Sequence, residues 1–183
     1  MGRAIAENCM LRGAHVTLVN ASVSVEPPMF VDVVNVTSAA DMADVVKSKA
    51  AEQDIIIMTA AVADFCPSHP ADEKIKKNDS SYESVIELER TEDIPSYLGA
   101  HKAKGQLICG FSMETQNMLE NSKAKLAKKN ADMIVANNLK VAGAGFGTDT
   151  NVVTLITADD CTELEIMDKS CVAARIMDRL LQM

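Results

Sequence analysis

Asp54-Ile-Ile-Ile-Met58 is the stretch that decides the fold, because four apolar residues in a row follow its single charge. A short run without polar positions is typical of a strand that helices cover on both faces, as in a parallel sheet. The residues before it predict such a helix, which is capped by Ser38, begins near Ala39 and ends at about Gln53. Residues 54–58 therefore indicate a central strand of an α/β fold.

Apolar runs and helical patterns alternate along the chain on both sides of this strand. Strands that alternate with helices imply parallel crossovers and a doubly wound sheet. We expect one domain over residues 1–183, because no linker or internal repeat interrupts the pattern. The other expected strands cover residues 15–19, 31–36, 84–88, 106–110, 133–135 and 152–157; the other expected helices cover residues 4–11 (with Gly13 as the C-terminal cap), 93–103, 116–129 and 169–182; and residues 61–81 are expected to form a long polar loop.

Composition disfavours some classes of function. The 183 residues are 48% hydrophobic and carry a formal net charge of −8. Broad binding to DNA or RNA normally requires a basic surface, so we expect no nucleic-acid partner. A nucleotide is still compatible with this charge, because a phosphate site needs only a few local cations and backbone N–H groups.

The cysteines and histidines indicate neither a disulfide framework nor a zinc site. Five cysteines cannot all pair and no two form a C-x-x-C motif, which favours free thiols in a reducing cytoplasm. The three histidines lie far apart in the sequence and lack the spacing of metal ligands. No signal peptide and no apolar run of membrane-spanning length is present, so we expect a cytoplasmic protein without membrane contact.

Small residues and one carboxylate directly follow the central strand. Residues 59–65 read Thr-Ala-Ala-Val-Ala-Asp-Phe. Ligands of open α/β sheets sit at the carboxyl ends of strands, where small residues let a base or phosphate approach the backbone and where Asp64 can accept hydrogen bonds. The alternative is a tight turn after the strand with a capping aspartate.

Lysines occur in two places that suit phosphate binding. Residues 73–77 (Glu-Lys-Ile-Lys-Lys) lie on the longest loop, from which a lysine could close over a triphosphate. Lys125 and Lys129 lie one turn apart on a predicted helix and share one face. Solvated lysines on an exposed loop and at a helix border are the alternative in both cases.

Three further segments are candidates for ligand contacts. Asp93 and Ile94 open a helix whose first N–H groups could hold an anion, although an aspartate there also complements the helix dipole. Phe111 ends an apolar strand and could stack on a base, although a single phenylalanine more often belongs to a core. Residues 143–147 are glycine-rich but match no phosphate-binding motif, so we expect a flexible connection there.

Taken together, these segments resemble the bacterial phosphopantothenate–cysteine ligases, the synthetase domain of the bifunctional coenzyme A biosynthesis flavoprotein. The order and spacing match over essentially the whole chain, and the combination is specific although no single piece is. The matching segments are A-A-V-A-D-F (60–65), E-K-I-K-K (73–77), I-C-G-F-S-M-E-T (108–115), K-A-K-L-A-K-K-N-A-D-M-I-V-A-N (123–137) and G-F-G-T-D-T-N-V-V-T-L-I (145–156).

The resemblance implies a Rossmann-like three-layer fold with a mostly parallel sheet, and a homodimer. It also implies a ligase that couples 4′-phosphopantothenate to L-cysteine. In that family CTP, assisted by Mg²⁺, converts the carboxylate to an acyl-cytidylate and pyrophosphate is released. The cysteine amine then displaces CMP. FMN is implied only if a decarboxylase domain is fused upstream.

The resemblance also implies roles for individual residues. Lys74 would be the flap lysine that stabilises the activation step, and Glu92 stands where the family usually has proline. The residues expected to bind CTP are Thr59 and Ala60 through their backbone, Asp64 on the nucleotide, Lys74, Asp93 and Ile94, Phe111 in the cytosine pocket, and Lys125 and Lys129 on the phosphates.

The chain departs from the family at its front. The family has a first strand and an N-x-S-S/T-G-x-x-G segment whose asparagine helps the cysteine to couple, and Met1-Gly2 matches only the end of that segment. For a chain without these parts we expect a damaged sheet, weakened phosphate binding and little ligase activity.

Two other functions stay open at this stage. The first is an NAD(P)-dependent Rossmann oxidoreductase, although no dinucleotide glycine motif is present and neither Tyr82 nor Tyr97 has a lysine four residues on. The second is a noncatalytic nucleotide-binding or dimerisation remnant, which would bind CTP without releasing pyrophosphate.

Overall fold

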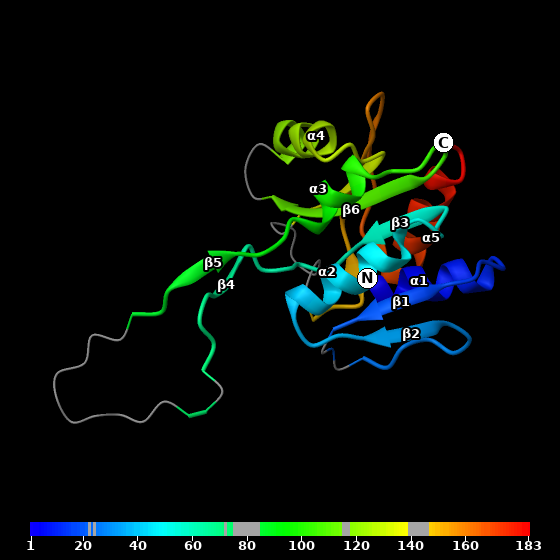
Figure 1. Ribbon diagram of the computed structural model, residues 1–183. Coiled ribbons are helices and arrows are strands. Elements are labelled where there is room, and N and C mark those ends of the chain that lie inside the picture. The colour runs from blue at the N-terminus through cyan, green and yellow to red at the C-terminus, as the bar shows by residue number, and fades with distance from the viewer. Residues whose placement is uncertain (22, 24, 72, 75–84, 115–117, 139–146) are drawn as a thin grey trace.

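The computed structural model describes residues 1–21, 23, 25–71, 73–74, 85–114, 118–138 and 147–183. Within them helices and strands alternate as expected (Figure 1). The helices are α1 (Gly2–Leu11), α2 (Ala39–Ala50), α3 (Ile94–Ala100), α4 (Met118–Lys128) and α5 (Lys169–Leu180). The strands are β1 (Thr17–Asn20), β2 (Asp32–Asn35), β3 (Ile55–Met58), β4 (Phe65–Pro67), β5 (Leu88–Arg90), β6 (Leu107–Glu114), β7 (Met133–Asn138), β8 (Thr150–Asn151), β9 (Val153–Ile156), β10 (Cys161–Glu163) and β11 (Met167–Asp168).

The central sheet has five strands in the order β10-β9-β7-β6-β3. β3, β6 and β7 run parallel, which confirms the prediction of parallel crossovers. The strand predicted over 152–157 is present as β9, but it runs antiparallel to β7, and β10, which pairs antiparallel with β9, was not predicted. β1 and β2 form a separate parallel pair, and within the described residues neither pairs with β3. In the described part of the chain, β1 and β2 are therefore separate from the five-stranded sheet.

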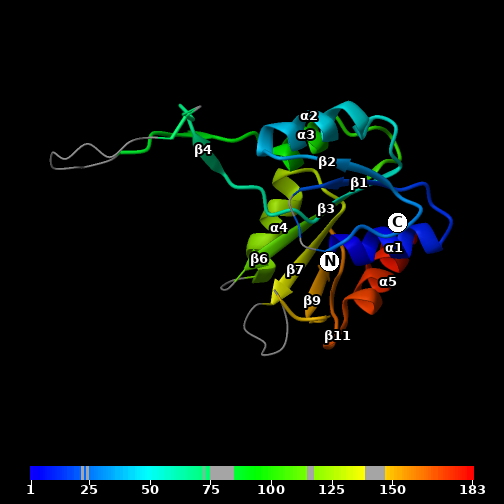
Figure 2. The same cartoon turned by 90° about the horizontal axis from the view of Figure 1, so that it is seen from below.

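Helices cover both faces of the sheet (Figure 2). α1 and α5 pack together on one face, where Ile5, Val172 and Ile176 join the inward side chains of β7 and β9 in a buried cluster. α2 and α3 cover the other face through Met42 and Leu98. The predicted three-layer α/β arrangement is thus confirmed, and none of its described helices is long and apolar enough to cross a membrane.

The predicted cap of α2 and the predicted glycine after α1 are both present. The Ser38 hydroxyl accepts a hydrogen bond from Asp41 N, and the Asp41 carboxylate accepts one from Ser38 N, which is a complete capping box. Gly13 follows α1 with φ of +85°, a conformation that suits glycine at the end of a helix.

The predicted loop over residues 61–81 is partly wrong. It contains β4, which pairs antiparallel with β5 to make a two-stranded arm that projects from the body (Figure 1). The strand predicted over 84–88 begins only at Leu88, and residue 84 lies outside the described residues. Residues 75–77 of the lysine run and 143–146 of the glycine-rich segment also lie outside them.

Gly99 sets how closely α3 approaches the segment after α4. A Cβ atom at this position would lie 1.9 Å from the carbonyl oxygen of Lys129, so a side chain cannot be accommodated without moving the backbone. The side-chain amide of Asn130 donates a hydrogen bond to the Gly99 carbonyl at 2.8 Å, which holds the two segments at this spacing.

Replacing Gly99 with alanine should therefore lower the free energy of unfolding by at least about 2 kcal/mol, because overpacking at a backbone contact must be relieved by a shift of α3. Urea unfolding followed by circular dichroism would measure the loss. Ala100→Ser adds one atom at an exposed position of the same helix and should change stability little. Equal stability of the two variants would contradict the role of this contact.

Candidate active site

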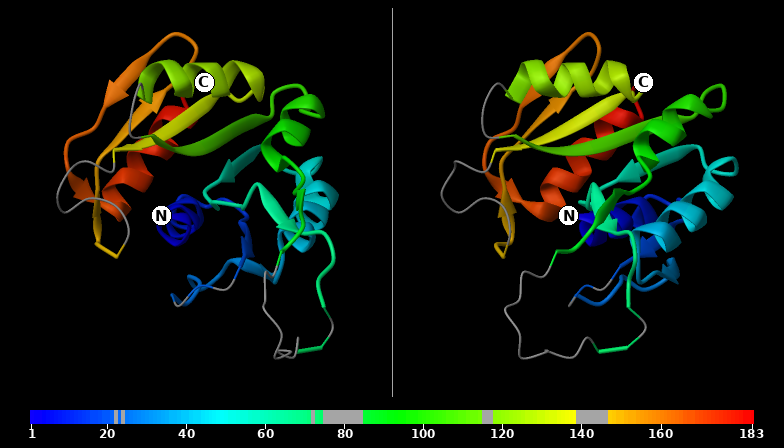
Figure 3. Two further views of the ribbon diagram at one scale, coloured as in Figure 1. Left: turned by 90° about the vertical axis from the view of Figure 1, so that its left-hand side faces the viewer. Right: turned by 60° about the vertical axis from the view of Figure 1, so that its left-hand side comes forward.

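A cleft of about 560 Å³ opens at the carboxyl ends of β3 and β6. Seen from that side, the N-terminus of α1 lies between α5 and β3 (Figure 3). Eight of the nine residues predicted as site residues line this cleft, although they come from four separate parts of the chain. They are Thr59, Ala60, Asp64, Asp93, Ile94, Phe111, Lys125 and Lys129.

The floor of the cleft follows from strand register. Met58 of β3 lies opposite Gly110 of β6, so the residues that follow them, Thr59 and Phe111, come together. Gly110 itself is tightly packed, because a Cβ atom there would lie 3.1 Å from Ile134. Phe111 is half-buried, which leaves part of its ring available to a ligand.

Lys125 and Lys129 reach the cleft from the end of α4. Leu126 is buried against the sheet and thereby fixes the rotation of this helix. Lys129 N donates a hydrogen bond to Lys125 O at 2.9 Å, so the helical turn continues through Lys129 and keeps both side chains on one face. The shared face predicted for the two lysines is therefore confirmed, and both line the cleft.

Asp93 is the N-cap of α3 and also the partner of Lys129. Its carboxylate accepts a hydrogen bond from Ser96 N at 3.2 Å and two from Lys129 Nζ at 2.8 and 3.0 Å. Partial burial acts to raise the pKa of Asp93, but the hydrogen bonds from Lys129 and Ser96 outweigh it and lower that pKa below its usual value. The carboxylate is therefore ionised and keeps Lys129 directed at the start of α3.

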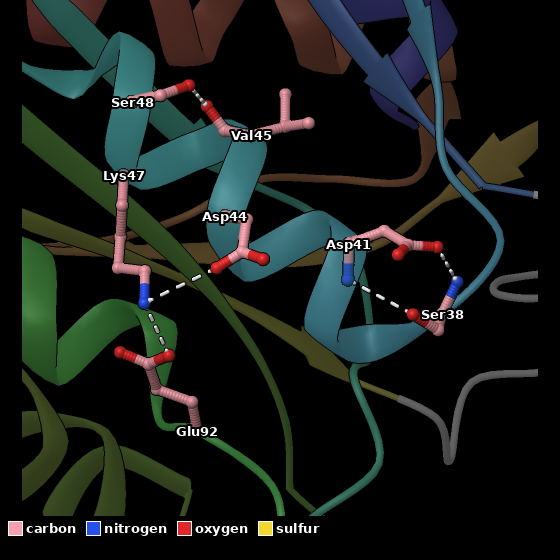
Figure 4. A network of polar contacts seen from close by, with 7 residues as sticks. All are labelled: Ser38, Asp41, Asp44, Val45, Lys47, Ser48 and Glu92. Carbon is pink, nitrogen blue, oxygen red and sulfur yellow. Dashed lines mark hydrogen bonds and ion pairs between the residues drawn. The ribbon is translucent and has the colours of Figure 1, made fainter.

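Glu92, which replaces the proline usual in the resembling family, is held by a second lysine (Figure 4). Lys47 of α2 donates to its carboxylate at 2.7 Å, and this hydrogen bond raises the pKa of Lys47. The Lys47 ammonium also lies 5.4 Å from the centre of the Tyr97 ring. Glu92 and Asp93 thus tie the start of α3 to α2 and to α4, respectively.

The arm begins at the cleft but carries Lys74 away from it. Thr91 N donates to Asp64 O at 3.1 Å, and the Thr91 hydroxyl donates to Ala63 O, which closes the base of the arm beside the cleft. Lys74 lies beyond β4, is exposed, and is the one predicted site residue that the structure does not bring to the cleft.

Several residues that line the cleft were not predicted. Asn137 and Asn151 come from β7 and β8, and Lys169 begins α5. Asn137 lies near the carboxyl end of β7, which runs parallel to β6 and β3, and could have been found by the rule that ligands sit at carboxyl ends. Lys169 reaches the cleft only through tertiary packing, so no local pattern marks it.

The cleft is locally basic in an acidic chain. Among its described lining residues four are basic and three are acidic. Within the described ranges, no group of three His, Cys, Asp or Glu side chains could hold a metal ion. The excess of basic side chains favours an anionic ligand.

Replacing Lys129 with methionine should raise the pKa of Asp93 toward the ordinary aspartate value of about 3.9. A carboxylate whose pKa is lower in the folded than in the unfolded protein stabilises the fold when it is ionised, and this stabilisation is lost as pH falls through the folded pKa. The difference in free energy of unfolding between wild type and variant should therefore shrink as pH falls through the folded pKa of Asp93. Carboxyl ¹³C NMR would measure the shift. Asp41, whose pKa is lowered by hydrogen bonds from Thr37 and Ser38, is the internal control and should not move. An unchanged Asp93 would contradict the pairing.

Comparisons with known proteins agree with this architecture. The family model for the DNA/pantothenate metabolism flavoprotein C-terminal domain matches residues 1–183. Coenzyme A biosynthesis bifunctional protein CoaBC of Bacillus subtilis (strain 168) is 44% identical over 182 residues, covering 98% of this chain and 44% of that protein. A protein named Cysteine/Cysteine sulfinic acid decarboxylase, from an unknown prokaryotic organism, is 44% identical over 183 residues, covering 99% of this chain and 50% of that protein. The chain thus spans about half the length of these relatives.

Solved structures give the same result. The crystal structure of the C-terminal domain of CoaBC matches 98% of this chain and 81% of its own with a TM-score of 0.81 and 40% identity. A Cab2 mutant in complex with phosphopantothenate-cysteine matches 98% of this chain and 77% of its own with a TM-score of 0.73, but at 14% identity it supports the fold alone. With a family model that matches from the first residue to the last, the chain belongs to the DNA/pantothenate metabolism flavoprotein C-terminal domain family.

Proposed function

We propose that this chain is the ligase domain of coenzyme A biosynthesis that couples 4′-phosphopantothenate to L-cysteine at the expense of CTP. The observation that carries the proposal is the convergence of eight predicted nucleotide-binding residues on one cleft at the carboxyl ends of the parallel strands. The family and the CoaBC relatives support the same pathway. We assign no decarboxylase role to these residues from the relative of that name, because this chain spans only half of that protein.

The cleft suits a nucleotide in size and chemistry. Its volume of about 560 Å³ falls within the range of roughly 300–1,000 Å³ that is usual for small-ligand pockets. The Phe111 ring offers a surface on which cytosine can stack, and the Asp64 carboxylate can accept hydrogen bonds from the nucleoside. Backbone groups at Thr59 and Ala60 lie where small side chains let a ligand approach.

In the first step, a carboxylate oxygen of phosphopantothenate attacks the α-phosphorus of CTP. The bond between that phosphorus and the bridging oxygen breaks, and pyrophosphate leaves with the extra negative charge. Lys125 and Lys129 are placed to stabilise this charge, because ammonium groups in a partly desolvated cleft act more strongly than in water. Binding of a phosphate to Lys129 competes with Asp93, which neutralises that lysine in the unliganded cleft.

In the second step, the cysteine amine attacks the carbonyl carbon of the acyl-cytidylate. CMP leaves, an amide bond forms, and the amine loses a proton. The activation is needed because a free carboxylate is a poor electrophile, whereas a mixed anhydride has a good leaving group.

Magnesium fits this cleft as a companion of the nucleotide. Mg²⁺ is usually bound by one or two carboxylates together with substrate phosphates, and Asp64 would contribute here, because the other two cleft carboxylates, Glu92 and Asp93, are paired with lysines. When bound it would supply neutralisation of phosphate charge.

The homodimer implied by the resemblance also stays a prediction, which sedimentation of the full-length protein would check.

The decisive test is pyrophosphate release from CTP by the full-length natural protein. Release should require 4′-phosphopantothenate, and addition of cysteine should yield CMP and phosphopantothenoylcysteine. A dehydrogenase would give no pyrophosphate, and a noncatalytic remnant would bind CTP without turning it over. Absence of release under saturating substrates would therefore reject the proposal.

Replacement of Lys74 with glutamine tests its proposed part in activation. If Lys74 stabilises charge only in the transition state, kcat for pyrophosphate release should fall about 100-fold while the KM for CTP changes little. Glu73→Gln removes a neighbouring exposed charge and should leave kcat within about twofold. Equal rates in the two variants would show that Lys74, which lies outside the cleft here, takes no part in the chemistry.

A further inference from the structure

Glu92 is an acidic side chain in a cleft for which we propose phosphate-bearing ligands. It lines the cleft next to Asp93, and its side chain is 43% exposed, so its charge acts on whatever the cleft binds. An unpaired carboxylate at this place would oppose a phosphate, because like charges brought close together disfavour binding. The proposed function uses the cations of the cleft but leaves this carboxylate unexplained.

The cation that pairs with Glu92 comes from outside the cleft. Lys47 of α2 places its ammonium 2.7 Å from the Glu92 carboxylate, and Lys47 is not among the described residues that line the cleft. Asp93, in contrast, pairs with Lys129, which lines the cleft itself. Lys47 therefore compensates a charge of the cleft without occupying the space that a ligand needs.

The Lys47 ammonium is held in place by contacts from two helices (Figure 4). Asp44, one turn earlier on α2, lies 3.7 Å from it, and the centre of the Tyr97 ring on α3 lies 5.4 Å from it. The Lys47 side chain is only 26% exposed. These contacts restrict the ammonium to the neighbourhood of Glu92 more closely than in an ion pair between two fully exposed side chains.

We infer that Lys47 is a positioning residue that sets the affinity of the cleft for phosphate-bearing ligands by neutralising Glu92. This role goes beyond the tie that the pair makes between α2 and α3. A tie is lost equally when either partner is removed, whereas neutralisation makes Glu92 unfavourable only when Lys47 is absent. The inference rests on the proposed function for the anionic nature of the ligand, and the two roles predict opposite effects of removing Glu92.

Isothermal titration of the full chain with tripolyphosphate tests the inference without requiring turnover. At an ionic strength of about 0.01 M, where the screening length is about 30 Å, Lys47→Met should weaken binding about 5-fold or more, because it leaves a bare carboxylate in the cleft. Lys47→Arg should retain most of the affinity. Lys104→Met makes the same change in net charge at an exposed position before β6, and as the matched control it should change affinity less than twofold.

Two further measurements separate neutralisation from a merely structural role. Near 1 M salt, where the screening length is about 3 Å, the affinities of Lys47→Met and wild type should converge to within about twofold. The isosteric change Glu92→Gln, added to Lys47→Met, should restore the low-salt affinity to that of wild type. Glu92→Gln alone should bind tripolyphosphate at least as tightly as wild type.

The inference would be overturned by Lys47→Met that binds within twofold of wild type at low salt, or by wild-type protein that does not bind tripolyphosphate at all. It would also be overturned if Glu92→Gln weakened binding as much as Lys47→Met and the double variant did not recover. Circular dichroism checks that each variant is folded. If Lys47→Met does not fold, Glu92→Gln alone decides, since weaker binding contradicts neutralisation and equal or tighter binding supports it.

The binding result is independent of the ligase assay. A protein that binds tripolyphosphate in a Lys47-dependent way but releases no pyrophosphate from CTP would reject the proposed reaction and keep the role of Lys47. A protein that releases pyrophosphate, with equal tripolyphosphate binding by wild type and Lys47→Met, would do the reverse.

Discussion

The parallel hydrogen-bond register of β3, β6 and β7 is the constraint on which the site depends. It places Met58, the last residue of β3, opposite Gly110, and Gly110 opposite Ile134, so that β6 and β7 continue past the end of β3 and end in register at Glu114 and Asn138. Thr59 follows the end of β3, and the longer strands β6 and β7 carry Phe111 and Asn137 to the same cleft. A register change of one residue would send every side chain of a strand to the other face, which the two buried helical layers do not permit.

Ion pairs then fix the segment that enters α3. Glu92 and Asp93 are neighbours in sequence but are held by lysines from different helices, Lys47 and Lys129. Exposed pairs of this kind contribute little to stability individually. Their main effect here is positional, because they hold the first turn of α3 at the cleft while Gly99 permits the close approach behind it.

Much of this arrangement could be predicted from local sequence patterns. The apolar run of β3, the Ser38 cap and the shared face of Lys125 and Lys129 are each encoded by residues close together in the chain. The arm was not predicted for two reasons. β4 contains Pro67, which disfavours a strand, and the strand that pairs with it, β5, lies far along the chain: Leu88, the partner of Pro67, is 21 residues further on. β8, β10 and β11 have only two or three residues each, too few for a periodic signal, and Lys169 reaches the cleft through tertiary packing alone.

The distribution of cations follows from the layered fold and bears on how two anionic substrates share one cleft. Phosphates and carboxylates repel one another, so their reacting ends can meet only where positive groups compensate both. Lysines on a single helix would compensate one side of the assembly. Because α4 and α5 belong to opposite layers, Lys129 and Lys169 approach the cleft from different faces of the sheet.

The two lysines differ in their partners. Lys129 is neutralised by Asp93 until a ligand competes for it, whereas Lys169 bonds only to the Thr148 carbonyl among the described residues. This difference predicts that an incoming phosphate meets less competition at Lys169 than at Lys129.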